Sequence, residues 1–302
     1  MPIDRVIEIA PAKINLALHV TGQRSDGFHK LETIVTFADR GDHLTLEASD
    51  VDGFDLTGRF SPSLTSQMAP GTDNLVLKAR DLIRRDLAQR GIAAPPVRIS
   101  LEKNLPIAAG LGGGSADAAA VLRGLARLWR ADLSASGRMS LARSLGADVP
   151  MCLAGRPLLA RGIGEEIDFL PHFPTLSLVL ANPLQPVSTP AAFRLLTQKS
   201  NAGLTLPDMT LDRAQWLAQL ALLRNDLEAP ARQLVPEIAL ISDLLRDAGA
   251  NLVRMSGSGA TCFGIFASDE VAEQAAEALS RLRPNWYFAA VKTRAGDAYV
   301  AH

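Results

Sequence analysis

Four glycines fall within five residues of this chain, at Gly110, Gly112, Gly113 and Gly114, directly before an alanine- and leucine-rich stretch. That stretch predicts a helix beginning near Ser115. The first backbone N–H groups of a helix lack partners within it, and the helix dipole adds about half a positive charge there. Because glycine lets a ligand approach the backbone closely, the segment predicts a phosphate-binding loop, in which Ser115 caps the helix or contacts phosphate or magnesium.

Two common phosphate-binding motifs do not describe this loop. The P-loop requires Gly-Lys-Ser/Thr, a string that occurs nowhere in the sequence. The dinucleotide fingerprint G-x-G-x-x-G requires glycine where the chain has Ser115 or Asp117, depending on the glycine from which it starts. The residues by themselves leave a second interpretation open, in which the glycines serve only close packing.

The elements before the loop are predicted to begin with a small β-meander. Alternating apolar and polar residues predict a strand over 8–20 and one or two strands over 31–48, and Asp26-Gly27 is a turn signal in the connector. Residues 50–71, which contain two prolines and several serines, are predicted to be rich in loops.

The glycine loop itself is expected between a strand and a helix. Residues 73–91 have an amphipathic helical pattern, and 95–106 predict a strand that leads into the loop. A further helix is predicted over 134–146. Asp148 is expected in a loop just past that helix, because Val149 precedes a proline and is biased towards extended backbone.

The second half of the sequence predicts an α+β domain that begins near residues 160–170. Strand-like patterns occur over 156–170, 176–183 and 286–296, and 251–268 predict a hairpin with a glycine-rich tip. Helical stretches are predicted around 211–249 and over 269–282.

Composition narrows the class of protein. The net charge is −1 and no basic stripe is present, so nucleic acid is not an expected partner. The two cysteines, Cys152 and Cys262, have neither zinc-site spacing nor a disulfide framework, which favours a reducing cytoplasm. The N-terminal segment carries charges and is not a signal peptide, and no apolar run is long enough for a membrane helix.

Four blocks of the sequence together resemble the GHMP kinase family. The glycine loop with Pro106 four residues before Gly110 resembles the phosphate-binding motif of that family. Residues 10–33, 146–150 and 255–266 resemble three further blocks, in the same order and with the same spacing. Within the family the match is to the members that act on a cytidylated sugar alcohol.

The resemblance implies an α+β, two-domain GHMP kinase fold. A βαβ-type N-terminal domain over residues 1–165 would carry the ATP phosphate loop and the catalytic pair. A ferredoxin-like α+β domain over 166–302 would carry the third glycine-rich motif. The active site would lie in the cleft between the two domains.

The resemblance also implies that Lys13 and Asp148 are the catalytic pair at the substrate hydroxyl. A carboxylate can orient a hydroxyl and accept its proton, while a nearby ammonium keeps that carboxylate ionised and offsets charge on the transferring phosphoryl group. Each residue alone has an ordinary alternative. Lys13 would be a solvated lysine on an exposed strand face, and Asp148 a loop carboxylate that caps backbone.

Further residues are implied to bind the cytidylated substrate. Asn15 lies two residues after Lys13 and therefore on the same side of the strand, where it would contact the erythritol end. His29 would hydrogen-bond the cytosine edge. The position before it is commonly tyrosine, and Phe28 keeps a stacking face but lacks the hydroxyl.

The other side of the cytidine site would be formed by the second half of the chain. Thr189 and Phe193 correspond to a threonine and an aromatic residue there, with a helix N-cap before Pro190 and a core phenylalanine as alternatives. The tip residues Gly257, Ser258 and Gly259 would face the phosphates or the substrate, although a hairpin turn alone would explain them.

ATP is implied as the phosphoryl donor, with magnesium bridging its phosphates. Asn74 and Leu75 fall where the family lines the adenine site, and Ser115 is the one candidate magnesium ligand. The residues expected to bind ATP through the loop are Pro106, Ala108, Ala109, Gly110, Leu111, Gly112, Gly113, Gly114 and Ser115.

The activity implied is phosphorylation of the 2-hydroxyl of 4-diphosphocytidyl-2-C-methyl-D-erythritol, in the non-mevalonate route to isoprenoid precursors. Its products would be the 2-phosphate and ADP. Two alternatives remain open: another GHMP kinase, of homoserine or mevalonate type, and a non-catalytic nucleotide-binding regulator. The chain is expected to be a monomer or homodimer without nucleic-acid or membrane partners.

Overall fold

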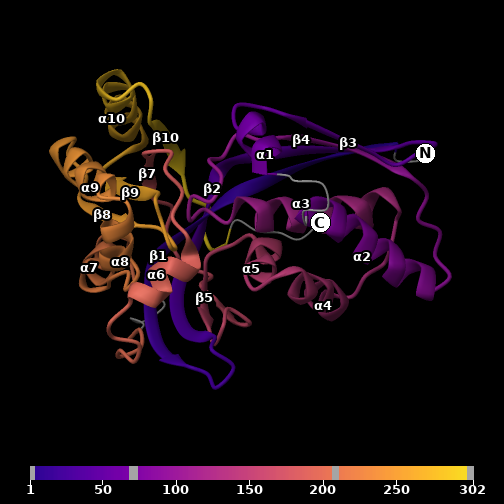
Figure 1. The fold of residues 1–302 in the computed structure, drawn as a ribbon, viewed down its shortest axis with the longest axis horizontal. Helices are drawn as coiled ribbons and strands as arrows, with labels where there is room; N and C mark the ends of the chain where they lie inside the picture. The colour runs from indigo at the N-terminus through magenta and orange to yellow at the C-terminus, as the bar shows by residue number, and fades with distance from the viewer. Residues whose placement is uncertain (1–3, 68–73, 206–210, 298–302) are drawn as a thin grey trace. The chain divides into compact units, whose positions relative to one another are not determined.

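The computed structural model describes residues 4–67, 74–205 and 211–297 (Figure 1). The strands are β1 (Arg5–Gln23), β2 (His29–Ala48), β3 (Gly53–Thr57), β4 (Val97–Glu102), β5 (Leu158–Arg161), β6 (Glu166–Phe169), β7 (Ser177–Asn182), β8 (Leu252–Met255), β9 (Cys262–Phe266) and β10 (Tyr287–Lys292). The helices are α1 (Ser61–Gln67), α2 (Leu75–Gln89), α3 (Gly113–Leu128), α4 (Ala135–Leu145), α5 (Val149–Ala154), α6 (Thr189–Leu195), α7 (Arg213–Leu222), α8 (Glu228–Leu234), α9 (Glu237–Asp247) and α10 (Asp269–Leu282).

These elements form two compact units, and neither unit is one continuous stretch of chain. The first comprises the chain up to Ala12, Arg40–Ile107 and Gly112–Ala154, and the second comprises Lys13–Asp39, Ala108–Leu111 and the chain from Gly155 onwards. Strands β1 and β2 therefore contribute residues to both units. The glycine loop also passes from the second unit into the first.

The first unit contains a βαβ arrangement. β4 pairs in parallel with β3 and antiparallel with the 43–48 part of β2. Helices α1 and α2 lie in the connection between the two parallel strands. α2 packs along α3, which also packs against α4 and α5 (Figure 1). The small residues of α3 are buried almost throughout its length, so this helix forms the centre of the unit.

The second unit contains a four-stranded antiparallel sheet in the order β10-β7-β9-β8. α9 packs on β8 and β9, and α10 packs on β7 and β10 (Figure 1). The buried faces of both helices share one core with residues of β7 and β9. This strand order and packing confirm the ferredoxin-like α+β prediction for the second half of the chain. β5 adds a short pairing with residues 33–35 of β2 and forms a hairpin with β6.

The predicted elements around the sites were recovered with five corrections. Residues 50–71 are not mainly loop, because β3 and α1 lie there, although 68–71 fall outside the described residues. β1 is buried on both faces from Ala10 to Val20, so it is not a half-exposed strand. Lys13 is only 4% exposed, which makes the solvated-lysine alternative wrong.

The other two corrections concern helix starts. α3 begins at Gly113 and its N-cap is Gly112, so Ser115 does not cap the helix. Val149 is the first residue of α5 and is not extended, and the following Pro150 is accommodated because proline is tolerated in the first turn of a helix. Asp148 therefore lies between two helices, immediately before α5. Within the described residues, no helix is long and apolar enough to cross a membrane.

Candidate active site

The start of α3 has the geometry expected of an anion site. Gly112 adopts left-handed backbone (φ 63°, ψ 23°), and no side chain caps the helix. The first helical amides are therefore left to a ligand or solvent, with the positive end of the helix dipole behind them. Ser115 lies in this first turn and is half-buried. The absence of a side-chain cap fits a loop that binds phosphate more directly than a loop that only packs.

A buried ion triad lies beneath this helix start. The Lys103 ammonium, at the end of β4, donates to the carboxylates of Asp42 and Asp117, the latter at 2.7 Å. Asp42 also accepts from the backbone N–H groups of Asn104 and Leu105, at 2.6 and 2.8 Å. A Cβ added at Gly113 would lie 3.1 Å from Lys103 Nζ. The triad therefore fixes β2, β4 and α3 together and occupies the space behind Gly113.

The triad carries an unusual proton balance. Burial raises the pKa of Asp117 to about 8, the Lys103 ammonium opposes that rise, and the Asp42 carboxylate adds to it. Burial lowers the pKa of the Lys103 ammonium, but its contacts with Asp117 and Asp42 outweigh that effect and raise the pKa above its ordinary value. The raised pKa favours the protonated form of Asp117 at neutral pH, which leaves Lys103 and Asp42 as a neutral ion pair beneath the start of α3.

Asn74 and Leu75 lie at the start of α2, beside the glycine loop. The Asn74 side chain caps this helix by accepting from the Val76 N–H at 2.9 Å. A Cβ added at Gly114 would lie 3.8 Å from the Leu75 side chain. Leu75 therefore lies next to the exposed Gly114 of the loop. The side-chain oxygen of Asn74 is already used to cap α2.

In the second unit, Lys13 and Asn15 form one buried polar group. The Lys13 ammonium donates to the Asn15 side-chain oxygen at 2.8 Å. The Asn15 amide donates in turn to the Thr33 hydroxyl, also at 2.8 Å. The Lys13 backbone N–H donates to Leu111 O at 2.9 Å, which ties this strand to the beginning of the glycine loop. The prediction that both side chains share one side of β1 is confirmed by their direct hydrogen bond.

Ser256, which the sequence analysis did not single out, connects the same strand to the loop. Its hydroxyl accepts from the Asn15 N–H at 3.0 Å and donates to Gly110 O at 2.9 Å. The neighbouring Thr261 N–H donates to Ala109 O at 3.2 Å. Gly110 has a φ of 74°, and a Cβ there would lie 2.2 Å from Ser256 O. The tip between β8 and β9 thus packs directly on residues 109–110.

Asn225 is a second residue of this region that no sequence pattern selects. Its side-chain amide donates to Met255 O and Gly257 O, both at 2.8 Å. Its oxygen accepts from the Leu227 N–H at 2.9 Å. These bonds fix the tip that carries Gly257, Ser258 and Gly259. Ser256 was detectable as the residue adjoining a selected motif, but no local pattern marks Asn225.

The residues expected around cytidine meet in two pairs. The rings of His29 and Phe193 are stacked, with centroids 4.4 Å apart and planes 15° apart. The hydroxyls of Thr189 and Ser258 are 2.7 Å apart. The N-cap of α6 is Ser188, so the alternative in which Thr189 caps that helix is wrong. Phe193 is half-buried against the core of the second unit as well as being stacked on His29.

His29 offers an unused polar edge, and Phe28 an exposed ring. His29 Nε2 is buried and has no hydrogen-bond partner among the described residues. Burial, and then the Lys199 ammonium, lower the pKa of His29, so the ring is neutral at physiological pH. Phe28 is 61% exposed on the turn between β1 and β2, where its N–H donates to the Asp26 side chain.

Asp148 belongs to the first unit, whereas Lys13 belongs to the second. The Asp148 residue is half-buried, and its carbonyl accepts from the Cys152 N–H at 3.1 Å. The described residues contain no group of three or more His, Cys, Asp or Glu residues that could hold a metal ion by itself. Magnesium in phosphoryl-transfer sites is bound largely by phosphate oxygens and waters, so a nucleotide-bound ion needs no such group of protein ligands.

Comparison with known proteins identifies the class. Residues 74–156 match the GHMP kinases N terminal domain, and residues 206–285 match the GHMP kinases C terminal domain. The chain belongs to the GHMP kinase family. Within that family it is 59% identical to the 4-diphosphocytidyl-2-C-methyl-D-erythritol kinase of Sinorhizobium medicae. The aligned stretch has 284 residues and covers 94% of each chain.

Solved structures agree with this placement. The crystal structure of a 4-(cytidine 5'-diphospho)-2C-methyl-D-erythritol kinase is similar with a TM-score of 0.78 and 34% identity, over 96% of this chain and 100% of that one. Homoserine kinase from Cytophaga hutchinsonii has a TM-score of 0.66 at 19% identity, over 97% and 96% of the two chains. The second likeness shows the shared fold alone.

Proposed function

We propose that this chain transfers the γ-phosphoryl group of ATP to the 2-hydroxyl of 4-diphosphocytidyl-2-C-methyl-D-erythritol, a step in the non-mevalonate route to isoprenoid precursors. The observation that carries the proposal is the 59% identity to the 4-diphosphocytidyl-2-C-methyl-D-erythritol kinase of Sinorhizobium medicae, over 94% of each chain. The uncapped, glycine-lined start of α3 supports a nucleotide donor. The unpartnered Nε2 of His29 supports a substrate with a hydrogen-bonding group at that point.

Lys13 and Asp148 are the proposed catalytic pair. Asp148 would orient the attacking hydroxyl and accept its proton, and Lys13 would offset charge on the transferring phosphoryl group. The Asn15 side-chain oxygen accepts from the Lys13 ammonium and so holds it in place. Asn15 is also proposed to contact the erythritol end. The retention of both members of the pair is what distinguishes an enzyme from a nucleotide-binding regulator.

The cytidine end is proposed to meet Phe28, His29, Thr189 and Phe193. Stacked rings 4.4 Å apart leave no space for a base between His29 and Phe193. The cytosine edge is therefore proposed to hydrogen-bond His29 Nε2, and the exposed face of Phe28 to stack on the base. A neutral imidazole can donate to or accept from that edge.

ATP is proposed to place its phosphates on the loop from Pro106 to Ser115 and its adenine near Asn74 and Leu75. Magnesium bound with the nucleotide would neutralise phosphate charge, and Ser115 is the residue we propose to hold it. The tip residues 257–259 are proposed to complete the substrate site. We further propose an N-terminal catalytic domain over 1–165 and a C-terminal domain over 166–302, in a cytoplasmic monomer or homodimer.

The position of the new phosphate tests the proposal. The 2-carbon of the substrate carries a methyl group and no hydrogen, so a phosphate on its oxygen has no proton three bonds away. We expect the product to show a phosphomonoester signal in the phosphorus spectrum without proton coupling, together with ADP. A coupled signal, as from a primary or secondary alcohol, or no new signal, would reject the proposed activity.

A further inference from the structure

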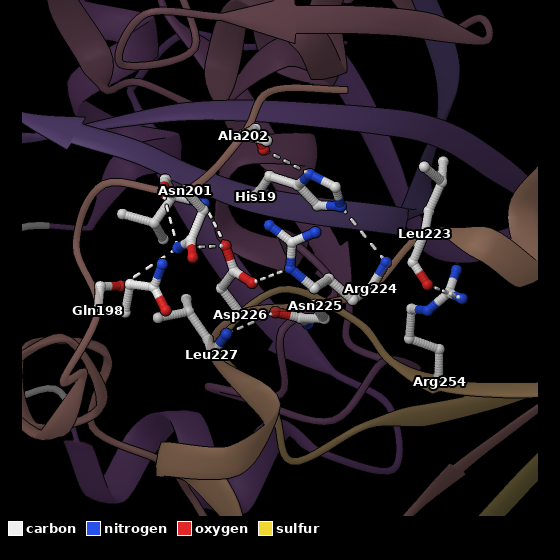
Figure 2. Close-up of polar contacts among 11 residues, drawn as sticks. His19, Gln198, Asn201, Ala202, Leu223, Arg224, Asn225, Asp226, Leu227 and Arg254 are labelled. Atoms are coloured by element: carbon white, nitrogen blue, oxygen red, sulfur yellow. Dashed lines mark hydrogen bonds and ion pairs between the residues drawn. The ribbon is translucent and has the colours of Figure 1, made fainter. Parts of the chain in front are cut away.

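A buried carboxylate lies where β1 meets the segment before α8. The Asp226 side chain is 7% exposed. One of its oxygens accepts from the Val20 N–H at 2.7 Å. The same oxygen accepts from the Asn201 side-chain amide at 3.0 Å (Figure 2). The other accepts from Arg224 Nε at 2.6 Å. Because the Arg224 side chain is 46% exposed, its ion pair contributes little, and the strand and amide bonds are the distinctive contacts.

Asn201 binds the backbone carbonyl of Val20, the strand residue whose N–H donates to Asp226. Its backbone N–H and its side-chain amide both donate to Val20 O, at 3.1 and 3.0 Å. Two residues earlier on β1, the Leu18 N–H donates to Arg224 O and its carbonyl accepts from the Asp226 N–H, both at 2.9 Å. The outer edge of β1 is thus held by two separate loops in place of another strand.

His19 lies on β1 between Leu18 and Val20, and its ring contacts both the loop after α6 and the segment before α8. Its Nδ1 is 3.2 Å from Ala202 O, and its Nε2 accepts from the Arg224 N–H at 3.4 Å (Figure 2). This arrangement requires the neutral ring with its proton on Nδ1. Burial, and then Arg224, lower the pKa of His19, which keeps the ring in that form.

The segments that meet here are those that carry the proposed cytidine residues. β1 runs on into the turn that bears Phe28 and then His29. The loop containing Asn201 follows α6, which bears Thr189 and Phe193. Beyond Asn201, the Leu204 N–H donates to the Glu32 carboxylate on β2 at 2.6 Å. The loop therefore binds both strands of the hairpin that presents His29.

We propose that Asp226, together with Asn201, is a positioning residue for the cytidine end of the substrate. This inference rests on the proposed function. The two side chains clamp the β1–β2 hairpin to the loop after α6, and so fix His29 against Phe193. Their hydrogen bonds join the β1 strand to the loop after α6, so their effect is on how the β1–β2 hairpin lies against α6.

The test compares two replacements of one residue. Asp226→Ala removes every acceptor, so the KM for the cytidylated substrate should rise about tenfold, equivalent to about 1.4 kcal/mol, while kcat and the KM for ATP stay within about threefold. Asp226→Asn can keep its oxygen towards Val20 and Asn201, and loses only the exposed Arg224 pair. It should therefore stay within about threefold of the parent.

Two further variants guard against a general loss of stability. Ser242→Ala removes a buried hydroxyl that donates to Ile238 O at 2.8 Å, on α9 in the same unit, and should leave both KM values unchanged. If Asp226→Ala does not fold, Asn201→Ala, which removes the partner amide from a half-buried residue, should show the same selective rise.

The inference is overturned if Asp226→Ala or Asn201→Ala raises the KM for ATP as much as the KM for the cytidylated substrate. It is equally overturned if neither KM changes, or if Asp226→Asn behaves like Asp226→Ala. A parent chain that does not turn over the cytidylated substrate would instead reject the proposed function, so the two failures are distinguishable.

Discussion

The triad of Lys103, Asp42 and Asp117 places one positive and two acidic groups where water is excluded. Lys103 and Asp42 lie 61 positions apart in the sequence, and only the pairing of β2 with β4 brings them together. No local pattern predicts that contact. The sequence signal for a buried acid is Asp117 itself, a single carboxyl among the alanines of residues 116–120. It is buried with those alanines in α3.

The proton on Asp117 gives the stability of the protein a definite pH dependence. The folded chain keeps this proton up to about pH 8, whereas an unfolded carboxyl releases it near its ordinary value of 3.8. The folded state therefore binds more protons between these values, and the free energy of unfolding should fall as pH rises through them. Lys103 stays charged throughout.

Asp117→Asn isolates this effect, because an amide does not titrate. We expect the free energy of unfolding of the variant, measured by denaturant titration from about pH 5 to about pH 9, to fall less steeply than that of the parent. Parallel curves for the two proteins would show that Asp117 is ionised throughout and would contradict the assignment.

Asp148 is the residue with the most direct chemical role in the proposal. Asp148→Asn keeps the shape of the side chain but removes the proton acceptor, so kcat should fall about a thousandfold while the KM for ATP stays within about threefold. Steady-state kinetics measures both quantities. An unchanged unfolding midpoint is the control for folding, and near-normal turnover would remove Asp148 from the mechanism.

Among the elements, the tip between β8 and β9 and the first residues of the glycine loop depend on each other. Ser256 bonds to both Asn15 and Gly110, so one hydroxyl positions the strand of Lys13 and the start of the loop. Position 110 requires glycine for two reasons: its backbone is left-handed, and a Cβ there would meet Ser256 O. The two reasons can be separated by comparison with a glycine that has a similar backbone conformation but open space around it.

Gly110→Ala should destabilise the protein by roughly 2–4 kcal/mol, because the added Cβ meets a carbonyl and the backbone is also strained. Gly91 has a similar φ of 69° and open space around it. Gly91→Ala should therefore cost only about 1 kcal/mol, the strain alone. Denaturant unfolding compares the two, and equal losses would show that the close approach of loop and tip contributes nothing.

Elements with a long periodic pattern were predictable, and short ones were not. The helix expected over 73–91 is α2, and the one expected over 269–282 has those same bounds as α10. β3 and α1 lie in the stretch 50–71, whose prolines and serines predict loop. β3 has five residues and is specified by its parallel pairing with β4 rather than by its own alternation. α1 is too short for propensity to decide.

The start of α3 shows a similar limit. Ser115 is a good capping residue, and propensity alone placed the helix start there. The chain begins the helix two residues earlier because Gly112 can adopt left-handed backbone, which leaves the first turn uncapped. The proposed phosphate loop thus departs from the locally preferred cap, and that departure leaves the first amides without an N-cap side chain.

For the whole molecule, the fold class and family could be predicted because four separated blocks match in order. The alternation of helices and strands in the second half predicts an α+β domain, and the ferredoxin-like strand order was implied by the family resemblance. The buried networks around Lys103, Asn225 and Asp226 could not be predicted, since each joins segments that only the folded chain brings together. These networks hold the proposed site residues but are invisible to motif matching.

Substrate choice is the property of the whole molecule that separates this account from its alternatives, because homoserine and mevalonate kinases share the fold. The most direct measurement is ADP release by the intact chain with three alcohols side by side: 4-diphosphocytidyl-2-C-methyl-D-erythritol, homoserine and mevalonate. The account predicts a kcat/KM for the cytidylated alcohol roughly a thousandfold or more above either of the others. Equal or greater kcat/KM with homoserine or mevalonate, or no ADP release with any of the three, would contradict it.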